Sequence, residues 1–412
     1  MRRQLILLLT LTLPLIGFGE LSDWIANEFI AKDQDPLFLE GVQDKVWKLN
    51  QLIEAPKEEL DLLLILNAQS DDQWTQSCAQ MQPSGLNNIA FGLENVSERM
   101  RQIYSDHLYE QQTLGCDTPY SWRLWLSPFI ENVAQQNLAS NKRGYREHFA
   151  GVTAAGDYQL PEDVLFTVGF SFANSHLKMN DEQAAAQCNT YAGSLGSIFK
   201  LSNFVIDTLL SYSYNTIDMN RQMTFSVATP YALGMDSRKA SSSQGANQIL
   251  AHVGCNYDFI CLANYTDTRN LTLYPFANLD YLYVMGDSYQ ENGALSLNLS
   301  VQEKSSDLLR PEMGIGMTLT QYTKQVDLLL DIAASYVHEF RFAGENNTVS
   351  FATSSHSFST KGLFPTNNLF CPTTRLRFAF PEKGISCTLG YHGAYGTYFS
   401  ENAGEAEFRF SF

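Results

Sequence analysis

The side chains that could support catalysis or bind a metal are scattered along this 412-residue chain. No two of its seven histidines stand at the HExxH spacing that places two zinc ligands on one helix face. His338 and Glu339 are neighbours at the end of a predicted strand, so their side chains point to opposite faces and cannot form a dyad. Residues 193–196 lack the GxSxG spacing of a nucleophile elbow, and the seven cysteines include no CxxC. We therefore predict no catalytic residues, no metal site and no cofactor.

The charge balance excludes another class of function. The chain has 27 basic and 44 acidic residues, which gives a formal net charge of −17. A protein that binds nucleic acid needs a basic surface, so we predict no nucleic-acid partner. Charged residues make up only 17% of the chain, while Phe and Tyr number 26 and 20. Few charges and many aromatic residues fit a β-protein in which apolar and polar residues alternate.

The first 19 residues have the plan of a secretory signal peptide. Arg2 and Arg3 precede an apolar run over residues 5–16, and Gly17 and Gly19 supply small residues for a cleavage site. The run is short for a transmembrane helix, although an uncleaved anchor is the alternative interpretation. We therefore expect export through the Sec translocon.

The elements that follow show two different periods. Residues 20–115 favour helices, because Val42, Val46, Leu49 and Ile53 recur with helical spacing. Pro56 begins a second predicted helix, and a third follows Ser84, which can serve as its N-cap. One stripe of this third helix carries apolar residues: Ile89, Leu93, Val96, Met100 and Ile103. We divide this region into a short helical passenger or linker at 20–84 and a helix with its linker at 85–115.

From residue 119 onward the period is two, which indicates strands. In the last segment Ala406, Phe408, Phe410 and Phe412 alternate with polar residues: Glu405, Glu407, Arg409 and Ser411. Alternation alone fits a soluble sandwich or a membrane barrel with a wet lumen. We mark about twelve strands, near 121–135, 145–159, 164–178, 187–200, 204–217, 243–257, 271–286, 294–308, 310–322, 326–340, 373–380/385–398 and 404–412. The segment 373–398 supplies two of them, without a clear division. The segment 349–360 fits either strand or loop, and residues 215–244 and 343–373 are expected to be long extracellular connections.

Several of these strands resemble those of a known family. The segments that carry the resemblance are 125–129, 145–158, 168–175, 273–281, 294–297, 307–314 and 334–340, in this order, followed by a terminal Phe412. In this order they resemble the C-terminal translocator of autotransporters, the type V secretion β-domain. The resemblance implies an all-β transmembrane barrel of about 12 antiparallel strands over residues 119–412. It also implies that the helix before the barrel threads the lumen.

The resemblance assigns roles to particular residues. The aromatic terminus, Phe408, Phe410 and Phe412, becomes the signal that the outer-membrane barrel assembly machinery reads. The helix residues Asn88, Glu98, Arg99 and Arg101 are expected to face the wet lumen, where Glu405, Glu407 and Arg409 could pair with them. Some family members cleave themselves at an Asn-Asn pair in this helix, but the surroundings of Asn87 and Asn88 do not follow that motif.

Three functions remain open at this stage. The first is a monomeric translocator in the outer membrane of a Gram-negative-type bacterium, seated in outer-membrane lipid, that exports or anchors a short N-terminal segment at the cell surface. The second is a stand-alone outer-membrane pore or surface antigen of the same descent, with the helix as its plug. The third is a soluble exported β-protein or an enzyme.

Overall fold

The structure is a computed structural model, which describes residues 69, 73, 77, 80, 86–113, 122–138, 144–160, 164–180, 184–229, 232–266, 269–323, 325–342, 346–351, 357–361 and 368–412. The predicted signal peptide and the two predicted helices near residues 42–53 and 56–67 lie outside these residues. One long helix, α6 (Leu86–Thr113), precedes the first strand. No helix among the described residues is both long and apolar enough to cross a membrane.

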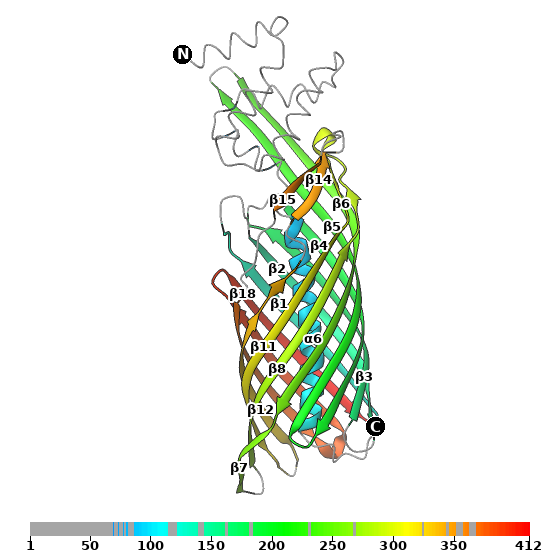
Figure 1. Ribbon diagram of the computed structural model, residues 1–412, viewed down its shortest axis with the longest axis vertical. Coiled ribbons are helices and arrows are strands. Elements are labelled where there is room, and N and C mark those ends of the chain that lie inside the picture. Colours follow the sequence, from blue (N-terminus) through cyan, green and yellow to red (C-terminus); the bar gives the residue numbers. More distant parts are fainter. Residues whose placement is uncertain are drawn as a thin grey trace, which may run out of the picture.

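Twelve antiparallel strands of the described part of the chain close into one barrel (Figure 1). Each strand is hydrogen-bonded to two neighbours, and β1 pairs with β18 to complete the ring. The barrel strands are β1 (Trp122–Gln135), β2 (Tyr145–Leu160), β3 (Val164–Met179), β4 (Ala184–Leu201), β5 (Phe204–Thr229), β6 (Ala232–Tyr257), β8 (Arg269–Gly286), β11 (Lys304–Gln321), β12 (Asp327–His338), β16 (Asn368–Phe380), β17 (Ile385–Tyr395) and β18 (Phe399–Ser411). Closure leaves no edge strand, and every backbone group can bond within the sheet, as a hydrocarbon environment requires. The predicted fold class is confirmed.

The two ends of the barrel differ. At one end the connections are short, such as 161–163 and 202–203, and β7 (Phe259–Thr266) forms a small extension with β8. At the other end β5 and β6 project together as a long hairpin, beyond the last pairing of β5 with β4 at Arg221 (Figure 1). A separate four-stranded sheet stands beside the hairpin, formed by β9 (Tyr289–Gln290), β10 (Leu299–Val301), β14 (Asn346–Phe351) and β15 (Ser357–Lys361).

Alternation along each strand divides the side chains between the two faces of the wall. On β1 Trp122 and Ile130 are each 58% exposed outside the barrel, whereas Arg123 and Glu131 are buried inside it. The last strand follows the predicted division, with Phe408 and Phe410 outside and Glu407 and Arg409 inside. The barrel therefore has an apolar outer surface suited to lipid and an inner surface that carries charge.

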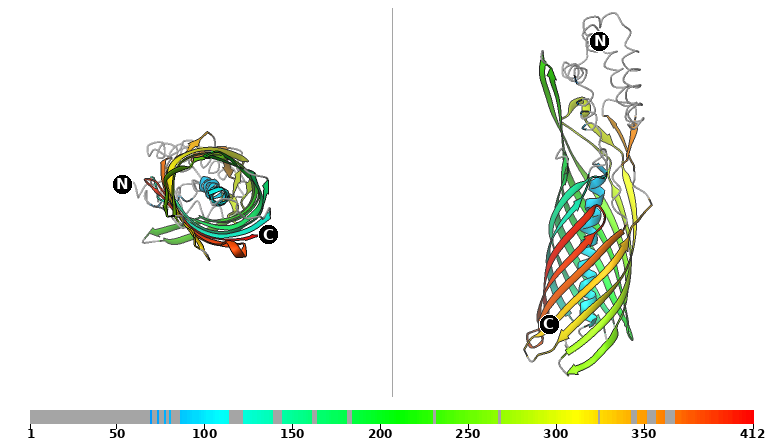
Figure 2. Two further views of the ribbon diagram at one scale, coloured as in Figure 1. Left: turned by 90° about the horizontal axis from the view of Figure 1, so that it is seen from below. Right: turned by 90° about the vertical axis from the view of Figure 1, so that its left-hand side faces the viewer.

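The helix α6 lies inside this ring of strands, as the view along the barrel shows (Figure 2). Its apolar stripe is buried, with the predicted residues Ile89, Leu93, Val96, Met100 and Ile103 all in the core. The wall comes close at Gly169 of β3, where an added Cβ would lie 2.3 Å from the Tyr104 hydroxyl. The placement of the helix in the lumen, predicted with the fold class, is confirmed.

Three predictions about the strands and their connections are wrong in detail. Residues 294–308 and 310–322 are not two strands, because β11 runs without a break from Lys304 to Gln321. Pro311 lies at a gap in the pairing of β11 on the side away from β8. On that side β13 (Phe340–Arg341) pairs with Leu308 and Leu309, and β12 pairs only from Glu312 onward. A proline, which has no backbone N–H to donate, is tolerated at such a gap. The expected loop at 215–244 is the paired outer part of β5 and β6, and 343–373 includes β14, β15 and the start of β16.

Candidate functional site

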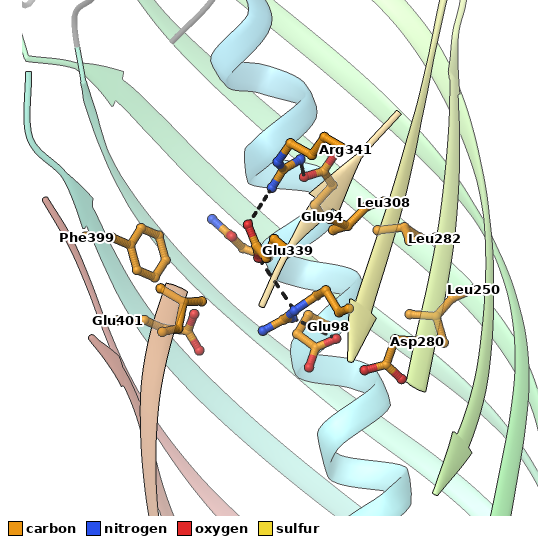
Figure 3. Close-up of a pocket in the computed structure, with 13 residues that line it drawn as sticks. Glu94, Glu98, Leu250, Asp280, Leu282, Leu308, Glu339, Arg341, Phe399 and Glu401 are labelled. Carbon is orange, nitrogen blue, oxygen red and sulfur yellow. Dashed lines mark hydrogen bonds and ion pairs between the residues drawn. The ribbon is translucent and has the colours of Figure 1, made fainter. Parts of the chain in front are cut away.

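The lumen holds a chain of ion pairs that runs along one face of α6. Near the long-connection end Glu94 pairs with Arg341, whose Nη2 lies 3.0 Å from Glu339 Oε2. Glu339 Oε1 in turn lies 3.5 Å from Arg310 Nε, and Arg310 Nη1 lies 3.0 Å from Glu98 Oε2. Figure 3 shows Glu94, Arg341, Glu339 and Glu98 between the helix and the wall. They line a cavity of about 20 Å³ together with Arg310.

The chain of pairs continues down the helix through Arg101. Arg101 contacts Glu98 one turn earlier, and its Nε lies 3.6 Å from Asp280 Oδ2 of β8. Its Nη2 also lies 3.8 Å from Glu312 Oε2 of β11. All of these side chains are almost completely buried, so acidic and basic groups alternate from the helix to the wall with little access to solvent. We call the set Glu94, Arg341, Glu339, Arg310, Glu98, Arg101 and Asp280 the ion-pair ladder.

Arg99 points to a different part of the wall. Its Nη2 lies 2.8 Å from Glu405 Oε2 of β18, and its Nε lies 4.0 Å from Glu131 Oε2 of β1. Arg99 with Glu405 is one of the several pairings between the helix and the last strand that the sequence left open. Glu98 and Arg101 pair instead with wall residues of other strands, and Glu407 pairs with a histidine. Among the described residues, therefore, neither Glu98 nor Arg101 pairs with the last strand. Asn88 is buried near β3, with its Nδ2 3.2 Å from Met179 Sδ.

Two histidines each lie between two carboxylates, and neither was singled out by sequence reasoning. His107 of α6 has Nε2 at 2.8 Å from Asp157 Oδ2 and Nδ1 at 2.9 Å from Glu407 Oε2. Trp125 stacks on the imidazole at 4.2 Å and donates a hydrogen bond to Asp157. A carboxylate at each ring nitrogen calls for two N–H donors, which only the imidazolium form has. We call this group the His107 clamp.

The second histidine belongs to the wall. His252 of β6 has Nε2 at 2.7 Å from Asp207 Oδ2 and Nδ1 at 2.5 Å from Asp280 Oδ1. Asp207 also accepts a hydrogen bond of 2.8 Å from Ser105 of the helix, and Asp280 joins the ion-pair ladder. One feature of the sequence points to both clusters. The alternation of the strands puts four acidic residues at inward positions: Asp157, Asp207, Asp280 and Glu407.

The last turns of α6 are held at the short-connection end. Glu110 lies 3.3 Å from Arg375 Nη2 and 3.5 Å from Arg377 Nη1, both on β16. Tyr109 donates a hydrogen bond of 3.2 Å to Asp258, in the connection between β6 and β7. Along its whole length, therefore, the helix is tied to the wall by buried charges and hydrogen bonds.

The predicted assembly residues lie on the outer surface. Phe408 and Phe410 of β18 face outward opposite Leu126 and Leu124 of β1. Phe412 is 65% exposed, and its backbone N–H donates a hydrogen bond of 3.0 Å to Trp122 O. Their role as an assembly signal stays a prediction.

Chemically, the lumen is arranged to bind a helix. Charged groups of α6 are engaged with charged groups of the wall at several levels of the lumen. No group of three or more His, Cys, Asp or Glu side chains in the described part of the chain is arranged to hold a metal ion. The geometry offers many charge-assisted hydrogen bonds, which are the strong class of such contacts.

Comparison with known proteins agrees with this architecture. A family model described as the autotransporter beta-domain matches residues 124–392. Outer membrane protein B of Rickettsia prowazekii (strain Madrid E) is 22% identical over 231 residues, which span 55% of this chain and only 13% of that protein. The translocator domain of autotransporter NalP from Neisseria meningitidis superposes with a TM-score of 0.56 at 13% identity, covering 80% of this chain and 99% of that domain. The match to the family model covers more than half of the sequence, and the chain belongs to the autotransporter β-domain family.

Proposed function

We propose that this protein is an outer-membrane translocator that passes the segment before α6 to the cell surface and keeps it anchored there through the helix. The observation that carries the proposal is the direction of the chain. The helix ends at Thr113 near the short connections, where β1 begins, and it starts at Leu86 towards the long hairpin (Figure 1). In outer-membrane barrels the short turns are periplasmic and the long connections are extracellular.

Residues that precede the helix support the same direction. Gln69 donates a hydrogen bond of 3.1 Å to Ser226 O, and Gln80 Oε1 accepts one of 2.6 Å from Thr224 N. Thr224 and Ser226 belong to the part of β5 that projects beyond β4. These contacts lie on the side of the barrel that carries the long connections, which supports exit of the segment at that end.

The buried contacts of α6 suit an anchor. Removing one partner of a buried ion pair costs about 3–5 kcal/mol, because a charge remains without compensation. The ion-pair ladder, Arg99 with Glu405 and the His107 clamp would all have to separate before the helix could slide. A chain that is held in this way stays attached to the barrel after transit.

The same proposal includes the partners and the location. The apolar outer surface, with residues such as Leu124, Phe170 and Leu195 more than half exposed, is suited to outer-membrane lipid. The Sec translocon would receive the predicted signal peptide, and the barrel assembly machinery would receive the aromatic terminus. We propose that the barrel acts as a monomer, because the described strands close the ring within one chain.

One observation favours a second candidate function, a pore with the helix as its plug. A cavity of about 80 Å³ lies beside α6, lined by polar residues that include Asp106, Asn256 and Asp331. A cavity of this size and polarity can hold several waters, so this side of the lumen is open to hydration. The two functions differ in where the segment before the helix is found.

Protease treatment of intact cells separates them. An epitope tag is inserted just after Glu20 in the full chain, and the barrel is followed on unboiled gels of the outer-membrane fraction. Loss of the tag while the folded barrel survives supports display at the surface. A tag that resists protease in a correctly folded outer-membrane barrel, yet is cleaved after the cells are lysed, would reject the translocator proposal in favour of the plugged pore.

A further inference from the structure

The short-connection end of the lumen carries basic groups that the helix does not fully engage. Arg377 of β16 and Arg409 of β18 face inward and are 3% and 7% exposed. Among the arginines in the described part of the chain, these two have an Nη1 atom that is buried without a hydrogen-bond partner. Arg377 Nη1 lies 3.5 Å from Glu110 Oε1, close enough for charge attraction but without hydrogen-bond geometry. Arg409 is in none of the ion pairs formed by the described residues.

The two arginines occupy one patch of the wall. Arg377 is opposite Thr388 of β17, and Thr388 is opposite Glu407 of β18, two positions before Arg409. Arg123 lies on the other side of β18, where its neighbour Trp125 is paired with Arg409. We call Arg123, Arg377 and Arg409 the entrance arginines, because their strands begin or end at the short connections.

The arginines of the ion-pair ladder differ from Arg377 and Arg409 in the number of carboxylates that they contact. Arg310, Arg341 and Arg101 each contact more than one carboxylate in the ion-pair ladder. A buried guanidinium whose N–H groups lack hydrogen-bond partners is unfavourable, since its lost hydration is not replaced. Two such groups at one opening therefore indicate that acidic groups engage them in another state of the protein.

The sequence contains a matching acidic segment. Residues 20–72 hold 13 acidic and 4 basic side chains, so this stretch alone has a net charge of 4 − 13 = −9. In the proposed function it is this stretch that enters the lumen from the short-connection end. Guanidinium groups bind carboxylates through paired hydrogen bonds, and a cluster of them attracts an acidic chain before contact.

We propose that the entrance arginines form a binding site for carboxylates of residues 20–72 as this segment enters the lumen, an inference that rests on the proposed function. The site engages successive acidic side chains during transit. Once α6 is seated, Glu110 lies beside Arg375 and Arg377 and takes the place of the moving carboxylates. The site therefore acts on the rate of entry rather than on the final position of the helix.

The test measures how fast the tag after Glu20 becomes accessible to external protease in pulse-labelled cells. Only barrels that migrate as folded species on unboiled gels are counted. The double variant Arg377→Gln/Arg409→Gln is expected to slow this step about tenfold, the low end of what electrostatic steering contributes. Lys383→Gln is the matched control, because Lys383 is an exposed cation in the turn between β16 and β17. It should leave the rate unchanged.

A second set of variants separates attraction from a structural role. In the segment variant Glu58→Gln/Glu59→Gln/Asp61→Asn, together with Asp71→Asn/Asp72→Asn, entry should also slow in the wild-type barrel. Adding the arginine substitutions should then have a smaller effect than in the wild-type segment, because the two sets act on the same interaction. An unchanged rate in the arginine variant, or a full additional slowing on top of the segment variant, overturns the inference. A tag that never becomes accessible in the wild-type protein rejects the proposed function itself.

Discussion

Arg99 of α6 and Glu405 of β18 are separated by 306 residues in sequence, and their side chains meet at 2.8 Å inside the barrel. Both side chains are almost fully buried. The pair therefore joins the helix directly to the strand that closes the barrel against β1. It makes the position of the helix dependent on a finished barrel, because the carboxylate is in place only when β18 is paired on both sides.

Substitution of Arg99 is expected to loosen the helix. In Arg99→Gln the buried carboxylates of Glu405 and Glu131 lose their nearest helix cation, which should cost about 3–5 kcal/mol. The folded form on unboiled gels should disappear at a lower temperature than in the wild type. Arg146→Gln is the control, since Arg146 is exposed on the outer face of β2. Equal melting of Arg99→Gln and the control would show that the pair does not hold the helix.

The His107 clamp leads to a prediction about charge compensation. His107→Gln leaves Asp157 and Glu407 facing an uncharged group, so the barrel should lose stability. Adding Asp157→Asn and Glu407→Gln removes the uncompensated charges and should restore most of the loss. The measurement is again the temperature at which the folded form disappears. His176→Ala, at an exposed position of β3, should have no effect. If the triple variant is no more stable than His107→Gln alone, charge is not what the clamp contributes.

Close packing between the helix and the wall is tested at two glycines. An added Cβ at Gly169 would lie 2.3 Å from the Tyr104 hydroxyl and 2.5 Å from Ala155 Cβ, while at Gly193 on the adjacent strand it would meet nothing within 4 Å. Gly169→Ala should therefore destabilise the protein by about 1–3 kcal/mol through overpacking. Gly193→Ala should be nearly neutral. Similar melting of the two variants would mean that α6 does not approach β3 as closely as described.

Most of the barrel could be predicted because alternation and strand order are local properties of the sequence. The inward charges of β18 and the outward aromatics around Phe408 follow directly from the period of two. The continuity of β11 could not be predicted, because a proline such as Pro311 normally indicates the end of a strand. Here the proline is tolerated because β11 lacks a pairing partner at this position on its β12 side, which only the structure shows. The paired hairpin of β5 and β6 was also missed, since Pro230, Gly234 and the Ser run at 241–243 are typical of a loop.

The lumen was harder to predict than the wall. Helical spacing identified the apolar stripe of α6, and the resemblance suggested that its polar residues face the lumen. Which wall residue meets which helix residue depends on the axial position and rotation of the helix, and neither is encoded locally. His107 was therefore not singled out, although its two partners are acids at inward positions of β2 and β18.

The final prediction concerns the terminal aromatic residue. Phe412 is 65% exposed, and its one described backbone contact is the hydrogen bond to Trp122 O. Deleting it therefore removes little from the folded barrel, and those barrels that do assemble should melt within a few degrees of the wild type. The amount of folded barrel in the outer-membrane fraction should nevertheless fall sharply, because the assembly machinery would lose its recognition residue. Phe412→Trp keeps an exposed aromatic ring and should assemble normally. Assembly that is unchanged in the deletion would reject the role of the terminus as a signal, whereas an equal loss of assembly and thermal stability would indicate a purely structural role.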